Sequence, residues 1–598
     1  MVLLMVPAGA EVGSVNDVST LLENKYGLVD PANNAQIARV HQIFDRVQDV
    51  ADKRGNRMPQ LSVVNKSDTP WAIALADGNI LLSLGAVNLC YKAVPQTEGD
   101  ARIAFVLGHE LAHLAKNDFW NRDFYLAIAG DGQGDPSRQR PVTDKTAQAD
   151  LRQRQATAWN KETEADDLGF LYAGIAGYPV QSLFSHLDEP DKNFFHLWTE
   201  LSQTNSPGYT LHPPPKEREA FLRARLESLA EEISFFNFGF RLAHFGDCEQ
   251  GISFLRKFLQ LFPAREVYNN LGACHLQRAQ QEIRSTAVAT IYWMPLLFDT
   301  ATRAEPLLLP YKSDRPRESS VLTPPIVPDK SGHDLDLAVE YFEQAAAADP
   351  AYLAARLNLA TARFYQGEIL KARSALEEAI RIAPTDKEVA GWHALLLYLD
   401  SRENGLGVAA LPHFTQLANQ KDAPLSLLFN HTLLMQKMGR KSREGWARLA
   451  GRSAQLPAHY ARIVCSASKV PCEKRDTVKG KPLPWPLPVQ PGIDLDAVDR
   501  EKLFAGWRAN RLGWLQDKRQ GTVYRRGEGE LVLDLDGYVA MVVLRGQDLG
   551  TSKALKRKLG RPTDIQQVTD GMVWSYGTDR AVLVRNGQVR EVWVAQKE

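Results

Sequence analysis

The stretch VLGHELAHLAKND, residues 106–118, carries two histidines with the spacing of a metal-binding pair. His109 and His113 are four residues apart, so on a helix both imidazoles project from one face about one turn apart. Zinc binds imidazole nitrogens at about 2.0–2.1 Å, and this spacing lets both rings reach one tetrahedral ion. Glu110 points roughly 100° away from them and has the position of a general base that activates water. The alternative is a pair of hydrogen-bonded core histidines that hold no metal.

The residues around the histidines predict a largely buried helix. Its apolar positions recur with helical spacing, at Ile103, Phe105, Val106, Leu107, Leu111 and Leu114. A zinc site needs a third ligand, which must come from another element. A second helix is predicted in WNKETEADDLGFLYAGIAGYPV, residues 159–180, where Glu162 and Asp166 are again four residues apart. Ala165 and Gly169 leave room there for close helix packing. The alternative for the two carboxylates is a solvated helix face.

The succession H-E-x-x-H, E-x-x-x-D within ETEAD, and AGY resembles the zinc metallopeptidase family that includes HtpX, the Oma-type mitochondrial proteases and the CAAX prenyl proteases. The resemblance implies an α+β zincin-type metallopeptidase domain over residues 15–233. It implies one Zn²⁺ per chain, held by His109, His113 and Glu162. By the same resemblance, Asp166 is the carboxylate that orients a ligand histidine.

Two further segments resemble elements of this family. YTLHPPPKERE, residues 209–219, matches a His-Pro element followed by an arginine. In the soluble periplasmic branch that resembles BepA, this histidine, here His212, can occupy the fourth zinc position and silence the enzyme. Its alternative is a residue of a helix-capping loop. Arg218 is implied to position substrate or to stabilise the developing oxyanion. Residues 71–75 resemble the edge strand that pairs with an extended substrate.

Residues 234–465 carry a helical repeat. Pro350 and Pro384 close two similar segments and are 34 residues apart. Three further pairs repeat at the same distance: Ala338 and Ala372, Phe342 and Leu376, Ala345 and Ala379. This period resembles the tetratricopeptide family and predicts an α-solenoid with an extended protein-binding surface. An apolar, proline-rich insert at about 282–334 is either a contact surface for a partner or a loop packed along the solenoid.

The last part of the chain is predicted to be a small α/β domain. Residues 466–498 form a proline-rich linker, and residues 499–598 begin with a helix and continue as hairpins. The dipeptides Asp536-Gly537 and Asn586-Gly587 mark two of the turns. This domain loosely resembles that of outer-membrane assembly lipoproteins, which implies a binding module. The fold class that we expect is therefore multidomain and mainly α.

Composition limits the partners and the location of the protein. Lys and Arg total 71, as do Asp and Glu, so the net charge of zero predicts no nucleic-acid partner. No apolar run is long enough to span a bilayer. Residues 1–14 are interpreted as the remnant of an export signal, or else as a frayed terminus. Two pairs of cysteines, Cys248 with Cys274 and Cys465 with Cys472, are either disulfides or isolated thiols.

These observations predict an exported, periplasmic zinc metalloendopeptidase that cleaves proteins in envelope quality control. Its repeats are expected to bind substrate or an envelope protein complex. The alternative is a chaperone or adaptor in which the repeats carry the function and the peptidase domain is latent or vestigial. The alternative location is the cytoplasm.

Overall fold

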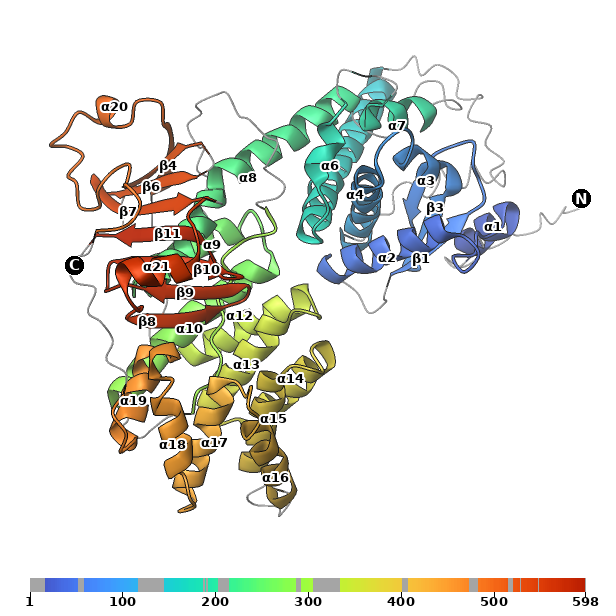
Figure 1. Cartoon of the computed structure of the whole chain (residues 1–598). Helices are drawn as coiled ribbons and strands as arrows, with labels where there is room; N and C mark the ends of the chain where they lie inside the picture. Colours follow the sequence, from blue (N-terminus) through green and yellow to red (C-terminus); the bar gives the residue numbers. More distant parts are fainter. Residues whose placement is uncertain are drawn as a thin grey trace, which may run out of the picture. The chain divides into compact units, whose positions relative to one another are not determined.

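In a computed structural model, the chain forms two compact units (Figure 1). Unit 1 comprises Met1–Ala230 with Arg303–Lys312, and unit 2 comprises Glu231–Thr302 with Ser313–Glu598. The structure describes residues 17–596 except for 52–58, 117–144, 187–188, 190–191, 203–213, 287–291, 305–333, 401–406, 473–481, 515–519, 528 and 547. The predicted fold class, multidomain and mainly α, is confirmed, because the described residues form a helical domain with a small sheet, a helical repeat region and a C-terminal sheet domain. No helix among the described residues is long and apolar enough to cross a membrane.

Unit 1 is a helical domain with one small sheet. Its elements are α1 (Asp17–Tyr26), α2 (Ala35–Val50), β1 (Gln60–Val64), β2 (Ala72–Ala74), β3 (Asn79–Ser83), α3 (Leu84–Cys90), α4 (Gln96–Lys116), α6 (Lys145–Ile175), η2 (Val180–Phe184), α7 (Phe194–Ser202) and the first part of α8 (Pro215–His244). The sheet has the order β1-β3-β2, with β1 parallel and β2 antiparallel to β3. Within the described part of the sheet β2 is thus an edge strand, as residues 71–75 predicted. Trp71, Ile73 and Leu75 bury their side chains in its core.

Two glycines let α4 and α6 approach each other closely. A Cβ atom on Gly108 of α4 would lie 2.8 Å from the carbonyl oxygen of Gly169 on α6. A Cβ atom on Gly169 would lie 2.6 Å from the backbone nitrogen of His109. Both distances are shorter than real contacts of this kind, so any larger residue would push the helices apart. The close packing that was predicted around Gly169 is therefore confirmed.

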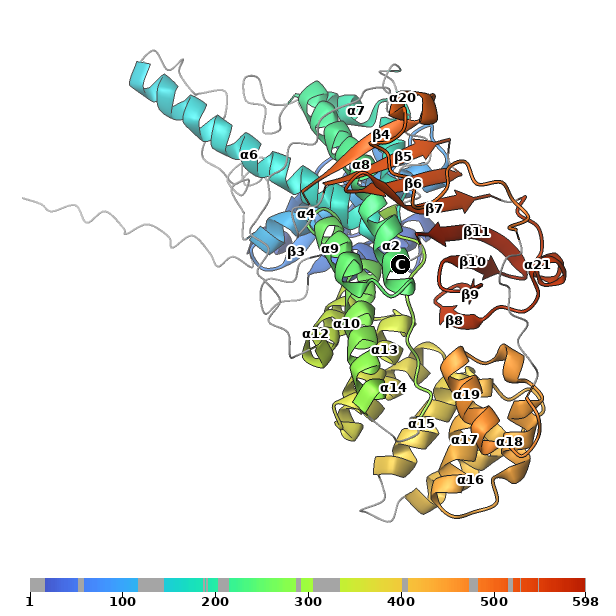
Figure 2. The same ribbon diagram turned by 90° about the vertical axis from the view of Figure 1, so that its left-hand side faces the viewer.

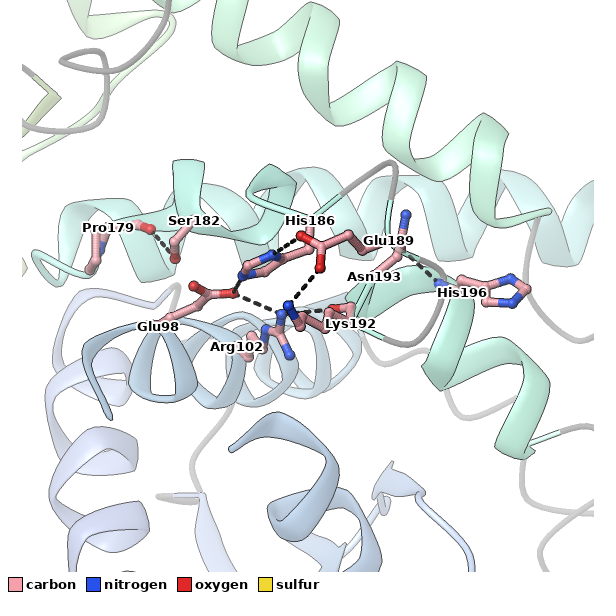
Figure 3. A network of polar contacts seen from close by, with 9 residues as sticks. All are labelled: Glu98, Arg102, Pro179, Ser182, His186, Glu189, Lys192, Asn193 and His196. Atoms are coloured by element: carbon pink, nitrogen blue, oxygen red, sulfur yellow. Dashed lines mark hydrogen bonds and ion pairs between the residues drawn. The ribbon is translucent and has the colours of Figure 1, made fainter. Parts of the chain in front are cut away.

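A polar network fixes the first half of α4 (Figure 3). Arg102 is 1% exposed and its Nη2 donates to Glu98 Oε1 at 2.8 Å and to the carbonyl oxygen of Lys192 at 3.0 Å. His186 lies on the other side of Glu98, with its Nε2 3.5 Å from the same Oε1, and its Nδ1 is 3.1 Å from Glu189 Oε1. A buried arginine is tolerated only when its charge is paired. This network ties α4 to the segment that follows η2 and so holds the helix that carries the histidines.

Unit 2 begins with a stack of helices. They are the last part of α8, then α9 (Cys248–Leu259), α10 (Arg265–Thr286), α12 (Asp334–Ala348), α13 (Leu353–Tyr365), α14 (Ile369–Ile382), α15 (Lys387–Asp400), α16 (Gly407–Ala418), α17 (Leu425–Lys437), α18 (Arg443–Ala450), η3 (Ser453–Gln455) and α19 (Ala458–Ala467). The alanine, phenylalanine and leucine residues that repeat at a distance of 34, such as Phe342 and Leu376, are fully buried, whereas the two prolines are exposed. Cys465 and Cys472 form a disulfide, whereas Cys248 and Cys274 are buried thiols that contact each other.

The C-terminal part of unit 2 is an eight-stranded antiparallel sheet with two short helices. Its elements are α20 (Arg500–Leu503), β4 (Arg508–Trp514), β5 (Gln520–Arg526), β6 (Glu530–Leu535), β7 (Tyr538–Arg545), α21 (Ser552–Leu559), β8 (Asp564–Val568), β9 (Gly571–Ser575), β10 (Arg580–Arg585) and β11 (Gln588–Ala595). The strand order β4-β5-β6-β7-β11-β10-β9-β8 is a palindrome of two four-stranded meanders that meet at β7 and β11.

The two meanders are copies related by a shift of 50 residues. Val523, Gly527, Val532, Leu533, Gly537, Val539 and Val542 each have an identical residue 50 positions later. The turns match as well, since Asp536-Gly537 and Asn586-Gly587 all have positive φ, as two-residue hairpin turns of type I′ require. Both copies carry a β-bulge at the same place, after Leu533 and after Leu583.

A buried charge pair joins this sheet to α8 within unit 2. Arg241 of α8 is fully buried, and its Nη2 bonds to Glu591 Oε2 on β11. Arg545 of β7 adds a second cation, with its Nε 3.1 Å from Glu591 Oε1. Burial acts to raise the pKa of Glu591, but the two arginines outweigh it and lower the pKa to about 2. The carboxylate is therefore ionised and neutralised at the helix–sheet boundary.

Candidate metal centre

Two helices of unit 1 bring three buried donor side chains together. His109 and His113 lie on α4 and are 6% and 4% exposed, and Glu162 lies on α6 and is fully buried. One ligand atom of each residue lies within 4.8 Å of the other two. The two Nε2 atoms are 3.1 Å apart. Glu162 Oε2 lies 3.3 Å from Nε2 of His109, and Glu162 Oε1 lies 3.4 Å from Nε2 of His113.

These separations fit the requirements of zinc. Zinc binds nitrogen and carboxylate oxygen at about 2.0–2.2 Å, so two corners of its tetrahedron are roughly 3.3–3.6 Å apart. The three measured donor–donor distances, 3.1, 3.3 and 3.4 Å, lie close to that value. Two imidazoles and one carboxylate are also a donor set that zinc prefers. The residues present therefore fit a zinc ion and leave a fourth position to be filled from outside this set.

A second carboxylate of α6 orients one of the histidines. Asp166 is 1% exposed, and its Oδ1 accepts a hydrogen bond from Nδ1 of His109 at 2.9 Å. A proton held on Nδ1 leaves the lone pair on Nε2, the nitrogen that faces His113 and Glu162. Burial disfavours the charged imidazole, but the bonds to Asp166 and Glu162 raise the pKa of His109 to about 9. The surroundings of this ring thus favour a positive charge, which a metal ion also supplies.

Arg218, at the start of α8, holds Asp166 in place. Its Nε donates to Asp166 Oδ2 at 2.6 Å and its Nη2 donates to Oδ1 at 2.5 Å, while its guanidinium lies 5.7 Å from the ring centre of Phe195. Burial alone would raise the pKa of Asp166, yet the charge of Arg218 and the bonds from Arg218 and His109 lower it to about 2. Two parallel N–H···O bonds fix both the position and the plane of a carboxylate.

The other predicted site residues lie as follows. Glu110 follows His109 on α4 and is 8% exposed. His212 lies outside the described residues, so its reach toward the other ligands stays a prediction. Arg218 was predicted to position substrate or to stabilise the developing oxyanion, and that role stays a prediction. In the structure it is buried and pairs with Asp166. Sequence reasoning missed this pair because the two residues are 52 positions apart and share no local pattern.

Comparison with known families agrees with this geometry. Residues 34–226 match the sequence model of peptidase family M48, and residues 332–396 match a tetratricopeptide repeat. The protein carries an M48 peptidase domain. The matched residues include both α4 and α6, so the M48 domain contains the three clustered donors and Asp166. The resemblance to a metallopeptidase followed by tetratricopeptide repeats is thereby confirmed.

Other comparisons add little to what the M48 domain implies. No curated protein matches the sequence. Similar solved structures include the human IFIT1 dimer with m7Gppp-AAAA, 14% identical, which covers 73% of this chain and 94% of that chain with a TM-score of 0.26. A monomeric mutant of IFIT1 with the same ligand is 12% identical. The match covers 75% of this chain and 100% of that chain, with a TM-score of 0.25. Naa15/Naa10 bound to HypK-THB is 14% identical. The match covers 64% of this chain and 58% of that chain, with a TM-score of 0.16. Scores this low support no functional argument.

Proposed function

We propose that this protein is a zinc-dependent endopeptidase with one Zn²⁺ per chain. The observation that carries the proposal is the spacing of the donor atoms of His109, His113 and Glu162, three buried side chains 3.1–3.4 Å apart. Membership of residues 34–226 in a metallopeptidase family supports it independently. A zinc ion bound there supplies Lewis-acid polarisation of the scissile carbonyl and acidifies water.

The side chains around the ligands have separate roles in this proposal. Glu110 accepts the proton of the attacking water and passes it to the leaving amine. Asp166 keeps the proton of His109 on Nδ1, so that Nε2 stays a ligand. Arg218 is a positioning residue for Asp166, because both of its bonds to that carboxylate are already made.

The substrate in this proposal is an extended polypeptide. β2 (Ala72–Ala74) is hydrogen-bonded to β3 on one side, and its other edge has no partner strand among those that the structure describes. Such an edge binds a peptide by adding it as a further strand, mostly through main-chain bonds. Recognition of this kind tolerates many sequences, which suits an enzyme that cleaves unfolded or damaged proteins.

We further propose that the protein works in an exported compartment, the periplasm, in envelope protein quality control, with its repeats binding substrates or a partner complex. The disulfide between Cys465 and Cys472 supports an oxidising location. Tetratricopeptide repeats support a role in protein interaction.

A second candidate is a chaperone or adaptor whose peptidase is latent, and the repeat region favours it. Zinc content and casein hydrolysis of the purified wild type and of Glu110→Gln separate the two functions. If the protein is an endopeptidase, the wild type and Glu110→Gln should each hold about one zinc per chain. Casein hydrolysis should fall by orders of magnitude in Glu110→Gln. If the wild type holds zinc, cleaves no casein and yet suppresses aggregation of an unfolded protein, the adaptor is the correct function.

A further inference from the structure

A segment of the insert runs through the repeat region as an extended chain. Residues 292–299 have no helix or strand, and yet Met294, Leu297 and Phe298 are at most 8% exposed. Figure 2 shows this yellow-green segment passing alongside α13 and α15. Its hydrogen bonds reach four helices of the stack, α10, α13, α15 and α17. The segment therefore follows the repeats in the manner of a bound peptide.

Asparagine side chains hold the main chain of this segment. Three of them each clamp one residue with a pair of bonds, in which the Asn Oδ1 accepts from the amide and the Asn Nδ2 donates to the carbonyl oxygen. The clamps, at 2.6–2.9 Å, are Asn430 on Trp293, Asn358 on Leu297 and Asn270 on Asp299. All three asparagines are at most 1% exposed. A side-chain amide that bonds to both main-chain groups of one residue recognises extended backbone and does not depend on the side chain of that residue.

One further bond to the segment comes from the position of a clamping asparagine in the next repeat. Trp392 is 34 residues after Asn358, and its Nε1 donates to the carbonyl oxygen of Trp293 at 3.2 Å. Equivalent positions of α13 and α15, the first helices of two neighbouring repeats, thus bond to the segment, as expected of the binding surface of a solenoid. A loop that serves only to connect two helices satisfies its backbone with its own turns or with water. Here the main-chain bonds go to side chains of four separate helices.

Aromatic side chains receive the large residues of the segment. The ring of Trp293 stacks on Tyr460 with centroids 4.7 Å apart and meets Phe429 edge-on at 6.3 Å. Tyr292 lies against Phe364, and Lys437 Nζ is 4.5 Å from its ring centre. These contacts favour an aromatic residue at the position of Trp293, four residues before Leu297.

The two helices that flank the insert pack on each other without the segment. α10 and α12 flank the insert in sequence and still pack directly on each other, with Gly272 of α10 so close to Phe342 that a Cβ there would lie 2.7 Å from its ring. The core between these helices therefore needs nothing from the insert. The clamping groups are polar amides that water can satisfy, so an emptied groove leaves no buried polar group without a partner.

We propose that the repeats form a groove for extended apolar polypeptide and that residues 292–299 are an internal ligand occupying it. A polypeptide segment of the same chemistry, with an aromatic residue and an aliphatic one four positions later, displaces this internal ligand. The groove is thus closed to partners until the internal ligand leaves. This inference goes beyond the proposed peptidase and does not depend on catalysis.

The test uses the full chain with Glu110→Gln, which prevents cleavage, and a fluorescent peptide of residues 290–302. Replacing Trp293 and Leu297 by alanine in the protein weakens the internal ligand. We expect the peptide to bind this variant at least about tenfold more tightly than the parent, because a competing occupant lowers apparent affinity in proportion to the fraction of open groove. Adding Asn358→Ala should abolish the gain, whereas Asn419→Ala, at the exposed end of α16, should not.

A second measurement distinguishes release of the segment from misfolding of the repeats. Hydrogen exchange of the parent protein should show slow exchange at the amides of Trp293, Leu297 and Asp299, and faster exchange there when unlabelled peptide saturates the groove. The helices α13 and α17 should keep their protection throughout. The proposal is overturned if the weakened variant binds no more peptide than the parent, or if its helices lose protection together with the segment, since the segment would then be part of the fold.

Discussion

Arg218 and Asp166 form a two-bond pair, with Nε 2.6 Å from Oδ2 and Nη2 2.5 Å from Oδ1, and the same Oδ1 accepts the Nδ1 proton of His109. A charge on α8 is thereby connected to a candidate metal ligand on α4 through one carboxylate. Arg218→Lys keeps the charge but cannot make both parallel bonds. We expect zinc affinity to fall about 10- to 100-fold, as is typical for residues that orient a ligand. Chelator competition measures this directly.

The contrary outcome for this variant is equally informative. If Arg218→Lys keeps full zinc affinity while KM for a peptide substrate rises, Arg218 contacts substrate, as the sequence resemblance implied, and its bond to Asp166 is incidental. Asp166→Asn serves as the matched variant, since it leaves Arg218 in place and should lower zinc affinity in either case.

Replacement of Glu162 tests the third ligand. Glu162→Ala removes one donor of the three and leaves two histidines, so zinc should be lost at chelator concentrations that the wild type withstands. Glu164→Ala on the same helix is the control, because Glu164 is exposed and pairs with Lys116. Full zinc retention in Glu162→Ala would show that the third ligand lies elsewhere.

Gly169→Ala tests the close approach of α4 and α6. Its Cβ would lie 2.6 Å from the backbone nitrogen of His109, so the helices must separate and carry the donors apart. We expect a loss of about 1–3 kcal/mol in stability, typical of overpacking, together with weaker zinc binding. Gly451→Ala is the matched control, since its Cβ would meet atoms no closer than 3.8 Å. Thermal unfolding of both variants, with and without zinc, decides the point.

Removal of His212 tests latency. If this residue occupies the fourth zinc position, His212→Ala should raise basal casein hydrolysis and leave zinc content nearly unchanged, because three ligands remain. The Glu110→Gln, His212→Ala double variant supplies the background. Unchanged or lower hydrolysis in His212→Ala would rule out the switch and favour a role for His212 in substrate binding.

Asp299 makes the stability of unit 2 depend on pH. Burial, together with the nearby charge of Glu266, raises the pKa of this carboxyl to about 7, well above its usual value near 3.8. The protonated form is therefore preferred in the folded state. The stability that this carboxyl contributes is fully present below about pH 4 and is lost as the pH rises to about 7.

Asp299→Asn should remove this dependence, because the amide stays neutral. Urea unfolding of wild type and variant at pH 5 and pH 8 measures it. The variant should gain stability relative to the wild type at the higher pH. If the free energies of unfolding of wild type and Asp299→Asn differ by the same amount at pH 5 and pH 8, Asp299 titrates alike in the folded and unfolded chains.

The sequence by itself determined several features that depend on local geometry. The i, i+4 spacing of His109 and His113 places both rings on one helical face whatever surrounds the helix. A period of 34 residues predicts stacked helix pairs, and Asp536-Gly537 predicts a hairpin, since both patterns reflect backbone preferences of neighbouring residues. The family resemblance added Glu162, which helical periodicity alone left open as a solvated face.

Only the tertiary structure decided which distant residues meet. Arg218 pairs with Asp166 across 52 positions, and Asn430 clamps Trp293 across 137. It also distinguished the bonded cysteines, Cys465 and Cys472, from the two buried thiols of α9 and α10. Side-chain contacts of this kind depend on how whole elements pack, and packing is governed by summed burial and shape over many residues, which no short sequence pattern encodes.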